Sequence, residues 1–253
     1  MDRLPAPPEL PTGMVLLGPL EPQDLRSRLS AQEREHLAAL PTEKRRRDWL
    51  LGRAAAKEAV RALLGATAPA WEEFSVLAGP EGGPLLAGAG LEEVRVSLSH
   101  GHGRALAWAR RSGTAGGLPG VDLERVRPRP EGTLRFYLDP EERAPVLALP
   151  AGQGEVAGPR DDLGVLLWAL KEAAFKALVP PRGVGLLDVK VELASPWEAA
   201  RGLARVDYRG PCAALAARLG VRAVRGEWCR LDDLVLAWVE AVGGRPLPPQ
   251  ALT

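Results

Sequence analysis

Two carboxylates separated by one residue are the first feature of the chain that could do chemistry. They are Asp122 and Glu124 in the segment GVDLERV (120–126), which alternates polar and apolar residues as a β-strand does. In a strand these two side chains point to the same face, with Cα atoms about 6.6 Å apart at about 3.3 Å per residue. Such a pair repels unless a cation lies between the acids. Gly120, just before them, permits a close backbone approach.

A helix further along the chain supplies a third carboxylate. Good helix formers run from 163 to 178, and Pro180-Pro181 stop them, so we predict a helix that ends near Val179. Trp168, Glu172 and Lys176 follow one another at intervals of four and share one stripe of this helix. Three carboxylates with open positions suit Mg²⁺, which takes one or two protein carboxylates, keeps water and bridges phosphates. The alternatives are an edge strand with protective charges and a surface Glu–Lys pair.

Two other segments offer contacts for anions. The residues from 94 to 111 alternate as a strand, reach the polar turn Ser99-His100-Gly101 and resume as a second strand, which predicts a hairpin-like corner. The segment 44–65 predicts a helix in which Arg53 and Lys57 share a face. Glycine beside a histidine, or a dense group of basic side chains, is able to hold a phosphate. A backbone-bonded turn histidine and a solvated basic face are the ordinary alternatives.

The chain also repeats itself, which predicts its architecture. The segments that begin at Trp49 and Trp168 share residue types at an offset of 119, and ALAWA at 105–109 resembles VLAWV at 235–239. The matched helix pairs are Trp49/Trp168, Leu51/Leu170, Ala54/Ala173, Ala55/Ala174 and Lys57/Lys176. We therefore predict an α+β fold of two similar halves, a pseudo-dimer of residues 1–113 and 114–253. Each half has a helix packed on a small, mostly antiparallel sheet, and the active site lies between the halves.

Composition narrows the possible functions. The chain has 253 residues and a formal net charge of +1, without the basic excess of a nucleic-acid or membrane-surface protein. Cys212 and Cys229 have no metal-ligand spacing, and the N-terminal MDRLPAPPELPTG lacks the apolar core of a signal peptide. We expect a cytoplasmic protein without a membrane span.

The motifs, taken in order, resemble one family. GVDLE, WALKEAAFK and SLSHGHGRALAWA are similar to the signatures of the Sfp-like 4′-phosphopantetheinyl transferases, over roughly residues 34–239. The resemblance implies a monomer of two similar halves that binds CoA and Mg²⁺ between them. It also implies the reaction, which is transfer of the phosphopantetheine arm of CoA to a serine of an apo acyl or peptidyl carrier protein, with release of adenosine 3′,5′-bisphosphate.

The resemblance also assigns roles to individual residues. Asp122, Glu124 and Glu172 would hold Mg²⁺ on the CoA pyrophosphate, and Glu172 would act as the base for the carrier serine. Lys176 would neutralise the leaving phosphate. The CoA contacts implied are Ser99, His100, Arg53, Lys57 and Lys171. This division of labour suits phosphoryl transfer, which depends mainly on positioning and charge neutralisation.

Two positions depart from the family pattern, and other functions compete with this one. Gly83 stands where many relatives carry a lysine, and Ser97 stands where they carry an asparagine. A magnesium nuclease would need Glu and Lys two residues apart on a strand, and GPEGGPLLAGAG lacks the Gly-Lys-Ser/Thr of a P-loop. The remaining alternative is a catalytically inactive relative that only binds carrier proteins. For carrier docking we expect the segment 125–162, in particular Arg135, Phe136, Tyr137 and Leu138.

Overall fold

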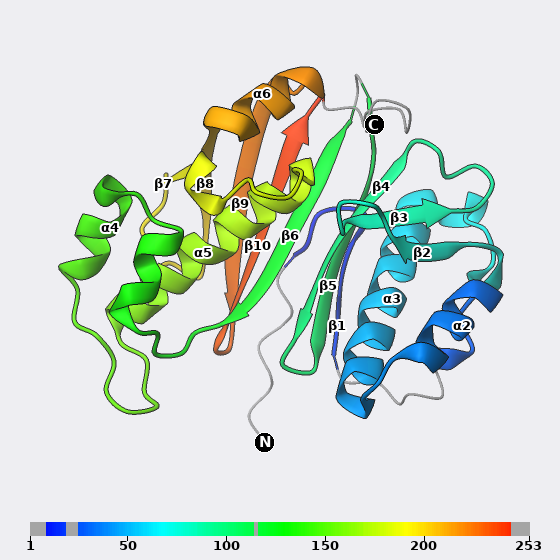
Figure 1. Cartoon of the computed structure of the whole chain (residues 1–253), viewed down its shortest axis with the longest axis horizontal. Helices are drawn as coiled ribbons and strands as arrows, with labels where there is room; N and C mark the ends of the chain where they lie inside the picture. Colours follow the sequence, from blue (N-terminus) through cyan, green and yellow to red (C-terminus); the bar gives the residue numbers. More distant parts are fainter. Residues whose placement is uncertain (1–8, 19–24, 114–115, 244–253) are drawn as a thin grey trace.

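The N-terminal half packs a long helix on a small antiparallel sheet. In the computed structural model, which describes residues 9–18, 25–113 and 116–243, this sheet has the strand order β1-β5-β4. Helix α3 covers one face of it, and a separate hairpin, β2-β3, lies beside the helix (Figure 1). The elements are β1 (Met14–Leu17), α2 (Ala31–Ala39), α3 (Glu43–Leu64), the 3₁₀ turns Gly65–Thr67 and Trp71–Glu73, β2 (Ser75–Ala78), β3 (Pro84–Ala87), β4 (Val94–Gly101) and β5 (Arg104–Arg111).

The C-terminal half has the same design with a larger sheet. Its strands follow the order β6-β10-β9-β8-β7, all antiparallel, and helix α5 lies across them. The elements are β6 (Gly117–Arg125), α4 (Pro140–Leu147), α5 (Pro159–Leu178), β7 (Val189–Leu193), β8 (Arg201–Tyr208), α6 (Gly210–Arg218), β9 (Ala223–Leu231) and β10 (Leu234–Val242), with 3₁₀ turns at Glu131–Phe136 and Leu186–Asp188. None of the described helices is long and apolar enough to cross a bilayer.

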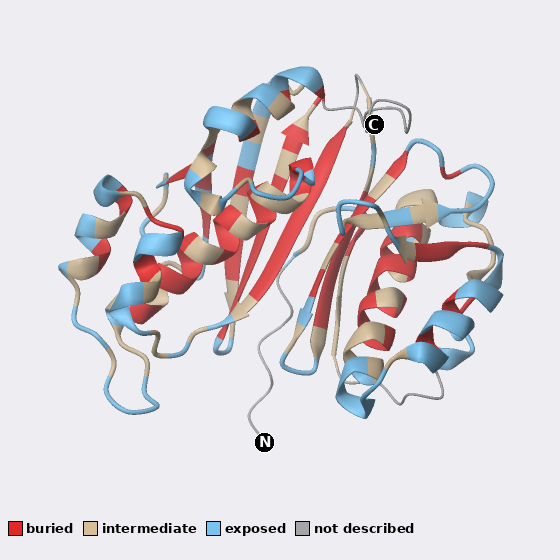
Figure 2. Cartoon of the chain, viewed as in Figure 1, coloured by how far each residue is buried: buried red, intermediate tan, exposed pale blue. Residues whose placement is uncertain are grey.

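The predicted α+β fold of two similar halves is confirmed by these elements. A third apolar cluster joins the halves. Helices α3 and α5 turn their buried faces toward their own sheets. The first turns of α3 are exposed, whereas nearly all of α5 is buried or half-buried (Figure 2). Between the sheets, Leu106 and Trp108 of β5 pack in one cluster with Leu236 and Trp238 of β10. These are matching positions of the two similar strand phrases. The domain boundary predicted after residue 113 stays a prediction, because residues 114–115 lie outside the described residues.

A buried lysine organises the first half. Lys57 of α3 is fully buried, and its Nζ lies 2.6 Å from Oε2 of Glu33. The same Nζ donates to the carbonyl of Phe74 at 2.6 Å. Glu33 completes a capping box with Ser30 at the start of α2, and its Oε1 accepts from Val76 N at 2.8 Å. One ion pair thus ties α2, α3 and the β2 hairpin together.

The second half contains the same arrangement. Lys171 of α5 is also fully buried and donates to Glu142 Oε2 at 2.7 Å and to the Val189 carbonyl at 2.5 Å. Glu142 completes a capping box with Asp139 at the start of α4, and its Oε1 accepts from Val191 N at 2.9 Å. Donor, acceptor, capping box and strand amide all correspond to those of the first half.

These lysines correct the register of the internal repeat. In the structure the counterpart of Lys57 is Lys171, at an offset of 114 residues, and not Lys176, at the predicted offset of 119. The helix ends agree, because α3 stops at residue 64 and α5 at residue 178. Both are followed by a residue of positive φ, Gly65 at 58° and Val179 at 48°. The halves are therefore similar, as predicted, but aligned five residues away from the sequence match.

Removing one buried lysine should destabilise the fold strongly. Lys57→Met keeps the length of the side chain but leaves the Glu33 carboxylate buried without its cation, and breaking such a pair typically costs about 3–5 kcal/mol. Lys44→Met is the control on the same helix, since Lys44 forms an exposed pair with Asp48 that is worth about 0–1 kcal/mol. Urea unfolding measures both changes. Equal, small losses for the two variants would contradict the role of the buried pair.

Candidate active site between the two halves

The strand that carries the paired acids is an edge strand of its sheet, but it is not exposed. β6 pairs with β10 on one side, and on its other side Val121 N donates to Ser97 Oγ of β4 at 3.0 Å. A Cβ at Gly120 would lie 1.8 Å from the carbonyl of Ala173, so the predicted close approach of the backbone to α5 is confirmed. Only 3% of Asp122 is exposed. This excludes the alternative of a solvent-facing strand with protective charges.

Asp122 joins the two halves of the molecule. Its Oδ1 accepts a hydrogen bond from Ser99 Oγ of β4 at 2.9 Å and one from Lys176 Nζ of α5 at 2.7 Å. Its Oδ2 is buried and has no hydrogen-bond partner among the described residues. A buried carboxylate oxygen without a partner is costly, and a cation is the group that best satisfies it. Ser99 was predicted to contact CoA, whereas its hydroxyl here donates to the acid.

Glu124 is held by two side chains that the sequence reading did not assign to it. Trp168 Nε1 donates to Oε1 at 3.1 Å, and an Arg129 guanidinium nitrogen donates to Oε2 at 2.9 Å. Burial raises the pKa of Glu124, and the charge of Asp122 raises it further, while Arg129 opposes the shift. The stripe of Trp168 and Lys176 on α5 therefore faces the two strand acids, as the spacing predicted.

Glu172 lies on the same stripe, between Trp168 and Lys176. Burial raises the pKa of its carboxyl, and the charges of Asp122 and Glu124 act in the same direction, against Lys176. Within the described residues, no group of three or more His, Cys, Asp or Glu is already arranged as a metal site. Mg²⁺ needs only one or two protein carboxylates. The free oxygen of Asp122 together with Glu172 fits that requirement, and each Glu124 oxygen, which accepts one hydrogen bond, keeps a lone pair for a cation beside them.

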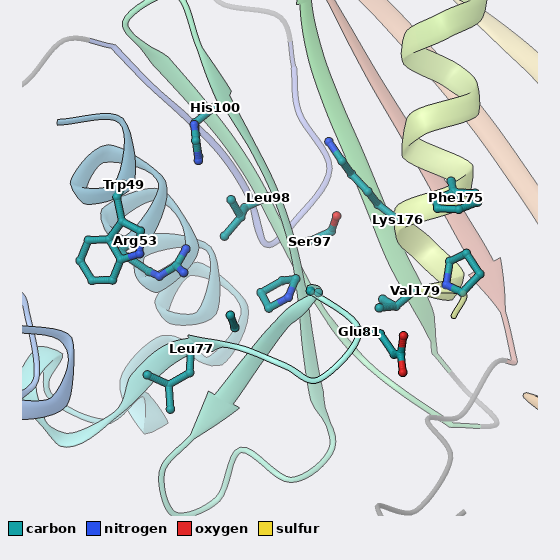
Figure 3. A pocket seen from close by; sticks show the side chains of 15 residues that line it. Trp49, Arg53, Leu77, Glu81, Ser97, Leu98, His100, Phe175, Lys176 and Val179 are labelled. Carbon is teal, nitrogen blue, oxygen red and sulfur yellow. The ribbon is translucent and has the colours of Figure 1, made fainter. Parts of the chain in front are cut away.

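A pocket of about 410 Å³ opens beside these acids, and Figure 3 shows how its walls come from both halves. Trp49 and Arg53 come from α3, His100 from β4, and Phe175 and Lys176 from α5. The guanidinium of Arg53 lies over the Trp49 ring, 4.7 Å from its centroid, and it forms no ion pair with the carboxylates that the structure describes. Three basic side chains and one acidic side chain, Glu81, thus line one pocket, and the excess of basic groups suits a polyanionic ligand.

His100 lies on a strand and not in a turn. β4 continues to Gly101, and the chain turns at His102 and Gly103, both of which have positive φ. His100 packs on α3, because a Cβ at Gly52 would lie 2.8 Å from its Cδ2. Partial burial lowers the pKa of His100, and Arg53 and Lys176 lower it further, while Asp48 opposes them.

Two of the predicted CoA contacts are wrong. Lys57 and Lys171 are fully buried and bound to glutamates and backbone carbonyls, so neither is able to reach a ligand. The position of Gly83 also has a local explanation. A Cβ there would lie 2.7 Å from Cγ1 of Val179, so the bulky residue at the end of α5 fills the space that a longer side chain would need.

Of the two similar strand pairs among the described residues, β6–β10 carries the paired acids and β1–β5 does not. Asp122 lies opposite Ala237 of β10. In the first half, Ala107 of β5 corresponds to Ala237 and lies opposite Val15, so Val15 occupies the position of Asp122. The position equivalent to Glu124 is likewise occupied by Leu17, opposite Ala105. In the part of the chain that the structure describes, the paired strand acids at these positions therefore occur on β6 and not on β1.

Parts of this chain resemble known proteins. Residues 119–220 match the family model described as the 4′-phosphopantetheinyl transferase superfamily. The chain is 31% identical over 159 residues to the 4′-phosphopantetheinyl transferase Svp of Streptomyces mobaraensis, and the match covers 61% of each chain. The family resemblance predicted from the motifs is therefore confirmed over residues 119–220. The chain spans about three fifths of the length of the curated relative.

Solved structures of holo-acyl-carrier-protein synthases match about half of the chain. The holo-ACP synthase of Plasmodium yoelii is 19% identical with a TM-score of 0.36, covering 51% of this chain and 95% of that one. The holo-[acyl-carrier-protein] synthase of Neisseria meningitidis is 21% identical with a TM-score of 0.36, covering 49% and 96%.

Proposed function

We propose that this protein transfers the 4′-phosphopantetheine arm of CoA to a serine hydroxyl of an apo acyl or peptidyl carrier protein. The observation that carries the proposal is Asp122. It is a buried carboxylate with one oxygen free, tied to Ser99 and Lys176 at the edge of a pocket with basic walls. A cation-binding acid beside a lysine is what a pyrophosphate requires. The superfamily match and the named relative support the same reaction.

The pocket orients CoA by its charges. We assign the 3′-phosphate to Arg53 and His100 on the first half and the pyrophosphate to Lys176 on the second. Ser99 acts through Asp122, since its hydroxyl donates to that acid. The adenosine would lie against the apolar walls of the same pocket, such as Leu77.

The transfer needs one bond made and one broken. The carrier serine oxygen attacks the phosphorus of the phosphopantetheine unit, and the bond from that phosphorus to the adenosine 5′-phosphate oxygen breaks. Glu172 takes the serine proton on its carboxylate, for which its raised pKa is suited. Lys176 stabilises the charge on the departing adenosine 3′,5′-bisphosphate. Mg²⁺, held by Asp122 and Glu172 with Glu124 beside them, would neutralise the pyrophosphate charge when bound.

The carrier protein would dock on the segment between the two acid-bearing elements. Of the side chains predicted there, Tyr137 and Leu138 belong to the core, with 1% exposed each. Phe136 is 65% exposed, and the guanidinium of Arg135 lies 5.0 Å from its ring centroid. Phe136 also lines a pocket of about 510 Å³ with Arg127 and Trp168, next to Glu124. An exposed aromatic residue with basic neighbours suits an acidic carrier helix.

Intact mass spectrometry tests the proposed reaction. The protein is incubated with CoA, Mg²⁺ and a panel of apo carriers, and each modified carrier gains the mass of one phosphopantetheine. The alternative, an inactive relative that only binds carriers, predicts binding without a mass change. We expect titration to give one CoA per chain, since one strand pair carries the acids. We also expect the protein to be a monomer and to act in the cytoplasm.

Arg53→Ala should weaken the binding of CoA much more than the binding of 3′-dephospho-CoA. Because Arg53 is assigned to the 3′-phosphate, its loss should weaken CoA about 10-fold, the worth of one charge-assisted hydrogen bond. Binding of 3′-dephospho-CoA should change little. Isothermal titration with both ligands measures the difference, and Arg205→Ala, at an exposed position of strand β8, is the control. Equal losses for the two ligands would remove Arg53 from the phosphate site.

A further inference from the structure

Glu124 is held in a clamp that is more elaborate than a surface ion pair. Both of its oxygens accept hydrogen bonds, one from Trp168 Nε1 at 3.1 Å and one from Arg129 at 2.9 Å. The Arg129 guanidinium also lies over the Trp168 ring, 5.2 Å from its centroid. Tyr137 meets the same ring edge-on with centroids 4.9 Å apart. The carboxylate therefore has its position fixed by side chains that support one another.

The backbone of Arg129 is fixed as well. Prolines stand on both sides of it, at 128 and 130, and limit the conformations of the loop. Its N–H donates to Asp161 Oδ1 at 3.0 Å. Asp161 lies in the first turn of α5, where its Oδ2 accepts from Gly152 N and Gly158 N. Arg129 is thus anchored to the helix that carries Glu172 and Lys176.

The neighbouring arginine shows the contrast. Arg127 lines the same pocket but is exposed and forms no ion pair with any carboxylate of the described chain. The side chain of Arg129 is only 19% exposed. Holding an arginine in this way costs conformational entropy and desolvation. Its partner, Glu124, lies two residues along the strand from Asp122. What is gained is a carboxylate held in place beside the proposed cation site.

We propose that Arg129, together with Trp168, is a positioning residue that acts through Glu124 and sets the affinity of the site for Mg²⁺. The inference rests on the proposed function, because it requires the acids of β6 and α5 to meet a cation. Hydrogen bonds to a ligating carboxylate orient it and keep its remaining lone pairs aimed at one point, and their loss typically weakens a metal site about 10–100-fold. Arg129 itself touches neither substrate in this proposal.

A double-mutant cycle on metal affinity tests the proposal without catalysis. Mn²⁺ serves as the probe, and its binding to the CoA-loaded protein is followed by electron paramagnetic resonance and by competition with Mg²⁺. Arg129→Ala should weaken Mn²⁺ about 10-fold, and Trp168→Phe, which keeps the ring but removes the donor, should weaken it less. In the Glu124→Gln background, Arg129→Ala should have no further effect. Arg127→Ala is the matched control and should leave the affinity unchanged.

The outcomes distinguish this inference from the proposed site. If Glu124→Gln weakens Mn²⁺ but Arg129→Ala leaves it unchanged or tightens it, the positioning role is wrong and the site stands. An equal loss from Arg129→Ala with and without the Glu124 carboxylate would also overturn the role, since Arg129 would then act by another route. If neither Glu124→Gln nor Glu172→Gln alters Mn²⁺ binding, the cation site itself fails. Thermal unfolding of each variant identifies any loss that comes from misfolding, in which case Trp168→Phe decides.

Discussion

Glu172→Gln should reduce phosphopantetheine transfer by at least about 10²–10⁴-fold, the usual contribution of a general base. The substitution keeps the shape of the side chain but removes its charge and its ability to take a proton from the carrier serine. Weaker cation binding should add to the loss, because Glu172 and the free oxygen of Asp122 form the proposed site. CoA should still bind through Arg53 and His100. The measurement is the rate of carrier modification at saturating CoA and Mg²⁺.

The internal repeat supplies a matched control for this experiment. In the observed register Glu58 of α3 is the counterpart of Glu172, and its carboxylate lies 2.6 Å from Arg28 with no strand acids beside it. Glu58→Gln should therefore leave transfer unchanged and cost little stability. A rate within a few-fold of wild type for Glu172→Gln would contradict the base assignment and favour the inactive carrier-binding alternative.

The sequence predicted the architecture and the faces that carry the acids and the helix stripe, because both depend on local spacing. The alternation around Asp122 and the four-residue interval from Trp168 to Lys176 each define a face, and those faces meet. The need for glycine at 120 could also be read from the sequence, since a helix carbonyl lies where a Cβ would be.

The errors share one physical cause, which is that burial is set by distant partners. Lys57 and Lys171 look like free cations on their helices, but each is paired with a glutamate from a capping box many residues upstream. The same capping boxes define the true register of the repeat. The matched tryptophan, leucine, alanine and lysine residues misplaced the register by five residues, because helices rich in alanine and leucine resemble each other in either register.

The clamp on Glu124 could be only half anticipated. Trp168 was visible as a member of the helix stripe, but Arg129 follows the strand in a loop, where spacing carries no information about direction. A signal was nevertheless present in the sequence, since an arginine between two prolines has a restricted backbone. Which of the nearby arginines reaches the acid depends on the bond from Arg129 N to Asp161, which no local pattern encodes.

Asp122→Asn should reduce the transfer rate about 10³-fold. It should also separate the two tasks of Asp122, which are to bind Ser99 and to supply a negative charge. Asparagine keeps the size of the buried side chain and is able to accept from Ser99, but it removes the negative charge that faces Lys176 and the proposed cation. Loss of one preorganised electrostatic group typically costs about 10²–10³ in rate, and the weaker cation site adds to this.

When metal is absent, Asp122→Asn should not weaken the binding of CoA. Lys176 loses the carboxylate that now holds its ammonium at 2.7 Å, and it already lines the pocket, so its charge becomes free to meet the pyrophosphate. Titration of CoA in the presence of a chelator should therefore show unchanged or tighter binding, while the transfer rate with Mg²⁺ collapses. A variant that loses CoA binding and transfer together would indicate that Asp122 merely holds the two halves in place, and a variant with a near-normal rate would remove it from the reaction altogether.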